Sequence, residues 1–289
     1  MTGNTRKNDA AANRKFKARI FEMLYSEPEE LLELYNAVNG TAYDDPGLLE
    51  INTLENAVYM AMYNDISFVI DLRLSLYEHQ STYSPNLPLR YLMYVADLYS
   101  QMTRDNNLYS RKKVMIPSPR FVIFYNGEEE QPDRQVLKLS ELYSVRGEAP
   151  ALELEAVMLN INKGHNVKLL DTCKSLREYA EYTARVRKYA KIMELDDAVE
   201  RAITECIREG ILSEFLQKNR AEAKKVSIYE YDAEKHIRME RAEAREEGRE
   251  ELLADMIRKK LGKGRTVPEI AEDLEMSEKE VQDIIDNMR

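Results

Sequence analysis

Cysteine and histidine are scarce in this chain of 289 residues, which contains two cysteines and three histidines. Cys173 and Cys206 lie far apart in segments with helical spacing, so they form no disulfide framework and no CxxC site. The histidines, His79, His165 and His236, do not stand at metal-ligand spacing from one another, which argues against a structural zinc site. These absences predict a reducing, cytoplasmic compartment, and they leave oxygen atoms as the ligands of any metal.

Long apolar runs are also missing. The best local run, residues 57–63, is far shorter than the roughly 20 consecutive apolar residues of a membrane-spanning helix. Residues 1–19 are polar and lack the apolar core of a signal peptide. We therefore expect neither a membrane partner nor export.

Acidic residues outnumber basic ones, but the basic residues are locally concentrated. The chain has 52 Asp and Glu against 42 Lys and Arg, a formal net charge of −10, which excludes a uniformly basic, histone-like binder of nucleic acid. Six basic residues fall within residues 1–20 and six more within residues 85–125, each group with few acids. Such segments are most often solvated faces. They would also suit a partner that carries phosphates.

The apolar pattern of the first half predicts an α/β fold with a mixed sheet flanked by helices. Helical spacing predicts one or two N-terminal helices over residues 16–38 and an amphipathic helix over residues 89–99. Short apolar or alternating runs predict strands around residue 58 and over residues 66–70, 72–80 and 120–125. The order helix, strands, helix, strand is typical of the α/β class.

Beyond residue 166 the strand signals fade and a helical C-terminal extension is predicted. We divide the chain into an α/β domain, a helical extension with a charged linker helix, and a small helical module, over residues 1–170, 171–250 and 251–289. The charged helix over residues 219–251 is interpreted as a solvated linker or a dimer contact.

Two capping boxes mark the final module, where Thr266 precedes Glu269 and Ser277 precedes Glu280 by three residues. The two short helices that follow give a helix-turn-helix outline. The second helix is rich in acids, which is the wrong charge for a phosphate-lined groove. A packing or oligomerisation role is therefore favoured over the reading of bases.

Two carboxylates are expected to approach each other on the predicted sheet. Strand side chains alternate, so Glu78 and Gln80 project from one face while His79 points away and is interpreted as structural. Asp65 opens the preceding strand, within reach of that face if the strands pair as a hairpin. Two carboxylates and a polar group suit Mg²⁺, although acids at strand ends commonly just face solvent. Without metal the two acids would repel, and the pKa of one would rise.

Several motifs in residues 13–170 resemble the Rpn family of recombination-promoting nucleases and transposase-like proteins, within the PD-(D/E)XK nuclease superfamily. The motifs are Asn64-Asp65 before an apolar strand, Glu78-His79-Gln80-Ser81, Pro85-Asn86-Leu87-Pro88-Leu89-Arg90 before a tyrosine-rich helix, and Pro117-Ser118-Pro119-Arg120 before Phe124-Tyr125-Asn126-Gly127. The resemblance implies a restriction-endonuclease-like mixed sheet flanked by helices. It also implies Mg²⁺-dependent or Mn²⁺-dependent hydrolysis of DNA phosphodiester bonds.

The resemblance further implies roles for individual residues. Asp65 and Glu78 would be the metal ligands, and Gln80, in the position of the superfamily's lysine, would complete the catalytic set. We assign no acid from the first helix. Residues expected to hold the DNA backbone are Arg90, Arg111, Lys112 and Lys113. Both acids are expected to lie at a partly open site outside the apolar core.

The sequence thus predicts a cytoplasmic, Mg²⁺-dependent DNA endonuclease (a hydrolase) associated with recombination or transposition. Because Gln80 cannot supply the positive charge of a lysine, a catalytically weak nuclease-fold factor that binds DNA or protein is an alternative. A defence or toxin-like nuclease regulated by its C-terminal helices is another. A homo-oligomer formed through those helices is a further expectation.

Overall fold

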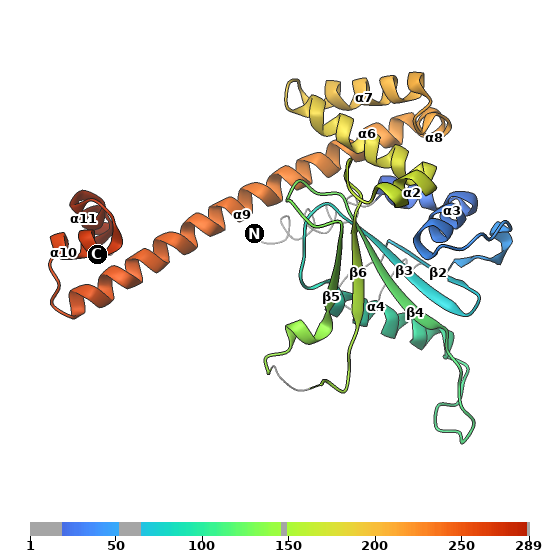
Figure 1. Cartoon of the computed structure of the whole chain (residues 1–289), viewed down its shortest axis with the longest axis horizontal. Coiled ribbons are helices and arrows are strands. Elements are labelled where there is room, and N and C mark those ends of the chain that lie inside the picture. Colours follow the sequence, from blue (N-terminus) through green and yellow to red (C-terminus); the bar gives the residue numbers. More distant parts are fainter. Residues whose placement is uncertain (1–18, 52–64, 146–148, 288–289) are drawn as a thin grey trace, which may run out of the picture. The chain divides into compact units, whose positions relative to one another are not determined.

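Figure 1 shows the computed structural model, which describes residues 19–51, 65–145 and 149–287. The chain forms two compact units, residues 1–233 and residues 234–289, and the long helix α9 (Arg220–Gly262) contributes to both. Within the described ranges, every helix is too short or too polar to cross a membrane.

A six-stranded mixed sheet lies at the centre of the first unit. Its strands follow the order β1-β2-β3-β4-β6-β5, in which β3, β4 and β6 run parallel and the other pairings are antiparallel. The strands are β1 (Glu50–Ile51), β2 (Ile66–Ile70), β3 (Arg73–Gln80), β4 (Ser118–Tyr125), β5 (Arg134–Lys138) and β6 (Glu155–Asn160). An α/β class with a mixed sheet is therefore confirmed.

Helices cover both faces of this sheet (Figure 1). One face packs against α4 (Leu87–Met102), and on β3 the side chains of Leu74 and Leu76 belong to that core. The other face, which takes Tyr77 of β3, belongs to an apolar cluster that also contains helices from both ends of the unit. Those helices are α2 (Arg19–Tyr25), α3 (Pro28–Asn39), α5 (Val167–Thr172), α6 (Lys174–Ala190), α7 (Leu195–Glu209), α8 (Ser213–Lys218) and the start of α9.

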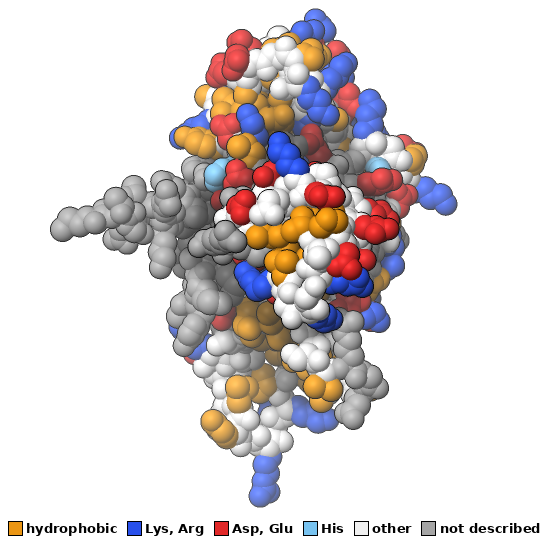
Figure 2. Space-filling model, turned by 90° about the vertical axis from the view of Figure 1, so that its left-hand side faces the viewer, with side chains coloured by type: hydrophobic (Ala, Val, Ile, Leu, Met, Phe, Trp, Pro, Cys, Tyr) orange, Lys and Arg blue, Asp and Glu red, His pale blue; other side chains and the backbone are white. Residues whose placement is uncertain are grey.

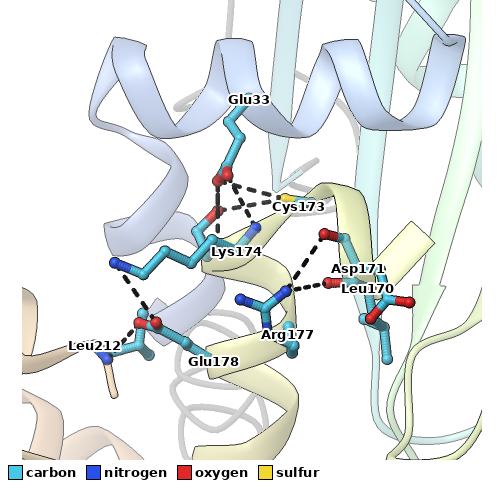
Figure 3. Close-up of polar contacts among 9 residues, drawn as sticks. Glu33, Leu170, Asp171, Cys173, Lys174, Arg177, Glu178 and Leu212 are labelled. Carbon is cyan, nitrogen blue, oxygen red and sulfur yellow. Dashed lines mark hydrogen bonds and ion pairs between the residues drawn. The ribbon is translucent and has the colours of Figure 1, made fainter. Parts of the chain in front are cut away.

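The carboxylate of Glu33, on α3, joins that helix to the beginning of α6 (Figure 3). It accepts hydrogen bonds from the backbone nitrogens of Lys174 and Ser175, at 2.9 and 3.2 Å, and from the hydroxyl of Ser175 at 2.6 Å. These bonds lower the pKa of Glu33 against the opposing effect of burial. An acid from a distant helix therefore caps α6 and complements the positive end of its dipole.

The sequence predicts three of the strands to within one or two residues: β2 as residues 66–70, β3 as 72–80 and β4 as 120–125. It does not predict β5 or β6. The predicted strand around residue 58 lies outside the described residues. The predicted domain boundary at residue 170 does not coincide with a break in the core, because helices beyond it share one apolar cluster with α2 and β4.

The second unit contains α10 (Val267–Leu274) and α11 (Glu278–Asn287), packed with the end of α9 around Ile257, Ile270 and Val281. Both predicted capping boxes are present: the Glu269 carboxylate accepts from the Thr266 backbone nitrogen at 2.8 Å, and Glu280 and Ser277 form the equivalent bond. The structure therefore contains the two capped helices of the predicted helix-turn-helix outline.

Candidate functional site

Asp65 and Glu78 come together at one end of the β2–β3 hairpin. The last paired residues of this antiparallel ladder are Ile66 and Tyr77. Asp65 directly precedes Ile66 and Glu78 directly follows Tyr77, so the two acids come next along the hairpin. Residues that face each other in such a ladder project from the same side of the sheet. The Oδ2 atom of Asp65 also accepts a hydrogen bond from the backbone nitrogen of His79 at 2.6 Å. The hairpin therefore brings both carboxylates to one end of the sheet, where Glu78 meets Arg90 of α4.

The carboxylate of Glu78 is buried, with 1% of the residue exposed. Its Oε1 atom accepts hydrogen bonds from the Gln80 amide nitrogen at 3.1 Å and from the guanidinium of Arg90. Its Oε2 atom is buried and has no hydrogen-bond partner among the described residues. The expectation of a partly open position is wrong for Glu78, because the first turns of α4 cover this end of β3.

Arg90 reaches the site from the beginning of α4. Its Nε and Nη2 atoms donate to the hydroxyl of Tyr94 at 3.1 and 3.0 Å, and Nη2 also donates to Glu78. The spacing of four residues brings Arg90 and Tyr94 onto one side of the helix. About a third of the Arg90 side chain, 34%, remains exposed. Tyr91 and Tyr94 are buried in the core, as their helical spacing indicates.

Burial makes both acids harder to ionise. It raises the pKa of Glu78 to about 7, against the opposing effects of Arg90 and Gln80. It also raises the pKa of Asp65 well above its usual range, and the charges of Glu78 and Glu22 raise it further. The hydrogen bond from His79 and the charge of Arg90 lower the pKa of Asp65 only in part. Arg90 therefore offsets the effect of burial on the two acids only in part.

Glu22 is a residue that sequence reasoning missed. We assigned no acid from the first helix, yet Glu22, on α2, lies close enough to raise the pKa of Asp65. Its neighbours Phe21 and Leu24 are buried, and Glu22 itself is only half-buried. An acid among residues with a core pattern is the signal that could have identified it.

Gln80 is held by the turn that follows β4. The backbone nitrogen of Asn126 donates to the Gln80 carbonyl oxygen at 2.9 Å. A Cβ atom on Gly127 would lie 2.4 Å from the Ser81 carbonyl oxygen, so this close approach of two backbones requires glycine. The Asn-Gly motif of the sequence thus positions the end of the strand that carries Glu78 and Gln80.

His79 lies on the opposite face of the sheet and is structural, as its alternation predicted. Its Nε2 atom is 3.0 Å from the hydroxyl of Tyr179, and its ring stacks on Phe21 with centroids 5.3 Å apart. Burial, with the charge of Arg187, lowers the pKa of His79 to about 3. The imidazole is therefore neutral at physiological pH and faces away from the two acids.

The basic cluster Arg111-Lys112-Lys113 does not lie beside the acids. It is exposed in the loop between α4 and β4, and β4 begins next to Arg73, the first residue of β3. Arg73 and Glu78 lie five positions apart along β3, a distance of about 17 Å. The cluster thus lies at the other end of the strands, on a loop that extends away from the sheet (Figure 1).

The coloured side chains in Figure 2 show Lys and Arg interspersed with Asp and Glu over the visible face. No broad basic surface forms there among the residues drawn in colour.

The acids fit a hard divalent cation as a two-carboxylate site. No group of three or more His, Cys, Asp and Glu side chains is arranged to hold a metal within the part of the chain that the structure describes. The unpartnered Oε2 of Glu78 nevertheless marks a buried position that a cation would satisfy. Mg²⁺ commonly binds through one or two carboxylates, with water and substrate phosphate completing its shell. Asp65 and Glu78 provide suitable ligands.

Comparison with known proteins returns no matching family model and no significantly similar curated protein or solved structure. The function is therefore argued from the chemistry of the site and from the motifs in the sequence.

Proposed function

We propose that this protein is a metal-dependent DNA endonuclease that acts in recombination or transposition, as the resemblance to the Rpn family implies. The observation that carries the proposal is the pair formed by half-buried Asp65 and buried Glu78, with one unpartnered oxygen on Glu78 and an arginine at the edge of the site. A mixed sheet with helices on both faces is also the architecture that the resemblance implies.

Each side chain of the site has a defined task in this proposal. Mg²⁺ or Mn²⁺, when bound, would lower the pKa of a water molecule and neutralise charge on the phosphate in the transition state. Asp65 and Glu78 would hold the cation, and the burial of Glu78 would reduce the screening of its charge by solvent. Gln80 orients Glu78 through the bond from its amide nitrogen. Arg90 would bind the phosphate through its fork of N–H groups.

The basic cluster Arg111-Lys112-Lys113 supplies a second contact with the DNA backbone. The two ends of β3, at Arg73 and Glu78, lie about 17 Å apart, which corresponds to about five base pairs of duplex DNA at 3.4 Å per base pair, and the loop that carries the cluster extends beyond the Arg73 end. A duplex that lies along the α4 side of the sheet would therefore meet both Arg90 and the cluster. Neither contact reads sequence, because both are made to phosphates.

Cleavage of supercoiled plasmid tests the proposal directly. Purified protein with Mg²⁺ or Mn²⁺ should convert the plasmid to nicked or linear forms, and EDTA should stop the reaction. Asp65→Asn is the matched variant, because an amide keeps an acceptor for the His79 backbone bond and removes the ligand charge. Equal cleavage by the variant, or cleavage in EDTA, would contradict the proposal.

The second candidate is a nuclease-fold protein that binds DNA without cutting it. The complete burial of Glu78 and its ion pair with Arg90 favour this alternative, because both oppose entry of a cation. It predicts that DNA binding survives in Asp65→Asn while plasmid stays intact with every divalent metal.

A further inference from the structure

Arg90 connects the buried acid with the surface of the protein. Its guanidinium pairs with Oε1 of Glu78, which is 1% exposed, while 34% of the arginine side chain is open to solvent. The same guanidinium donates twice to the Tyr94 hydroxyl and lies 5.8 Å from the centroid of that ring. One cation therefore both compensates a buried carboxylate and reaches the edge of the site.

Arg90 stands where a divalent cation would compete with it. It occupies Oε1 of Glu78, whereas Oε2 of the same carboxylate has no partner among the described residues. A cation that takes Oε2 together with Asp65 would share Glu78 with the guanidinium. Two positive groups on one carboxylate repel each other strongly in a buried site. The bond between Arg90 and Glu78 is therefore the one that binding of a cation weakens.

We propose that Arg90 is a cation-controlled phosphate contact, which neutralises Glu78 in the metal-free protein and turns to the DNA backbone when a divalent cation replaces it. This inference rests on the proposed nuclease function and assigns the regulation of that same site. Tyr94 keeps its two bonds to the guanidinium, so the released group stays at the edge of the site. The planar fork of N–H groups matches two phosphate oxygens.

Binding of metal and binding of DNA are then linked. The cation frees Arg90 for the phosphate, and the phosphate draws Arg90 away from Glu78, so each ligand tightens the other by the same factor. In the absence of DNA the arginine acts as a competitor of the metal. Removal of the Arg90 charge should therefore strengthen metal binding to the DNA-free protein. It should also weaken the coupling between metal binding and DNA binding. A purely structural role for Arg90 predicts the opposite effect on metal binding.

Calorimetric titration of Mn²⁺ into the full chain without DNA measures the first effect. Arg90→Gln should bind Mn²⁺ about three- to tenfold more tightly than wild type, within the usual range of coupling between sites. Arg90→Lys, which keeps the charge, should bind Mn²⁺ as wild type does. Asp65→Asn should lose binding. If wild type binds no better than Asp65→Asn, the proposed function itself fails.

Fluorescence anisotropy with a labelled duplex measures the second effect, in Ca²⁺ and in EDTA. Ca²⁺ should tighten DNA binding by wild type about fivefold or more. The tightening should be smaller in Arg90→Gln and intermediate in Arg90→Lys, which retains the charge without the fork. Circular dichroism checks that each variant is folded. If Arg90→Gln does not fold, the tightening of DNA binding in Arg90→Lys decides. Equal or weaker Mn²⁺ binding by Arg90→Gln, or undiminished tightening in both variants, would overturn the role of Arg90 and leave the nuclease proposal standing.

Discussion

The Oδ2 atom of Asp65 accepts a hydrogen bond of 2.6 Å from the backbone nitrogen of His79, the residue that follows Glu78. This bond joins the start of β2 to the end of β3 across the hairpin. The relative position of the two acids is thus set by backbone geometry, and Arg90 of α4 pairs with Glu78. The backbone therefore fixes the two acids relative to each other, and entry of a cation depends on Arg90.

The pH dependence of stability in EDTA is the first prediction. The pKa of Glu78 is raised from its usual 4.5 to about 7, so the folded protein holds this proton more tightly than the unfolded chain. The stability that this group contributes is present at low pH and is lost as pH rises through about 7. Relative to Glu78→Gln, which does not titrate, wild type should lose about 2 kcal/mol between pH 5.5 and pH 8.

Urea unfolding of both proteins at the two pH values measures this difference. The comparison measures the titration of Glu78 together with its effect on Asp65, whose pKa the charge of Glu78 raises. Parallel pH profiles, or a relative gain in wild-type stability as pH rises, would show that the buried acid is already ionised at low pH.

The basic cluster provides the second prediction. Replacing Arg111, Lys112 and Lys113 by alanine should reduce the slope of log K against log salt concentration by about 2.7 for duplex DNA. Metal binding should stay unchanged, since the cluster lies at the other end of the strands. A control variant with Lys188→Ala and Lys191→Ala removes exposed charge from the end of α6 and should leave the slope as in wild type.

Anisotropy titrations at several salt concentrations give these slopes. A slope equal to that of wild type in the triple variant would remove the loop from the DNA interface.

The third prediction concerns the cap that Glu33 forms on α6. Glu33→Ala should lower the free energy of unfolding by about 1–3 kcal/mol, because it leaves the backbone nitrogens of Lys174 and Ser175 without their acceptor. Glu29→Ala, on the exposed side of the same helix, should change it by less than about 0.5 kcal/mol. If urea unfolding showed the same loss of unfolding free energy in Glu33→Ala and Glu29→Ala, the cap would contribute no more to stability than a surface acid.

The C-terminal unit supplies the fourth prediction. Its apolar cluster of Ile257, Ile270, Ala271 and Val281 is separate from the clusters on the two faces of the sheet. A chain that ends after residue 233 should therefore keep its sheet, its metal affinity and its cleavage, because the acidic helices add little to phosphate binding. Loss of DNA affinity in this folded truncation would assign the module a direct role in DNA binding. Sedimentation of both chains would show whether the module makes a homo-oligomer.

Much of the sheet could be predicted from local patterns, whereas its far edge could not. Alternation and the continuous apolar run identified β2, β3 and β4. The strand β5 is short, charged at both ends and buries only Leu137, and β6 buries Ala156 and Met158, whose types have modest strand preference. The change from strands to helices near residue 170 suggested a domain boundary, but tertiary packing joins those helices and one face of the sheet in a single apolar cluster.

The candidate site was predictable where it depended on one strand and one hairpin. Alternation along β3 placed Glu78 and Gln80 on one face and His79 on the other. The burial of Glu78 was not predictable, because acids near strand ends usually face solvent and only the approach of α4 covers this one. The ion pair with Arg90 and the influence of Glu22 depend on the placement of two helices against the sheet, which no local pattern contains.

The most direct test of the central claim is plasmid cleavage by four proteins prepared in parallel: wild type, Asp65→Asn, Glu78→Gln and Gln80→Ala. With Mg²⁺ or Mn²⁺, wild type should cleave, the two acid variants should lose at least about a hundredfold in rate, and Gln80→Ala should lose less because it removes no ligand charge. Circular dichroism should show that all four are folded. Equal rates in wild type and the acid variants, or activity that persists in EDTA, would contradict the assignment of Asp65 and Glu78 as a metal-dependent nuclease site.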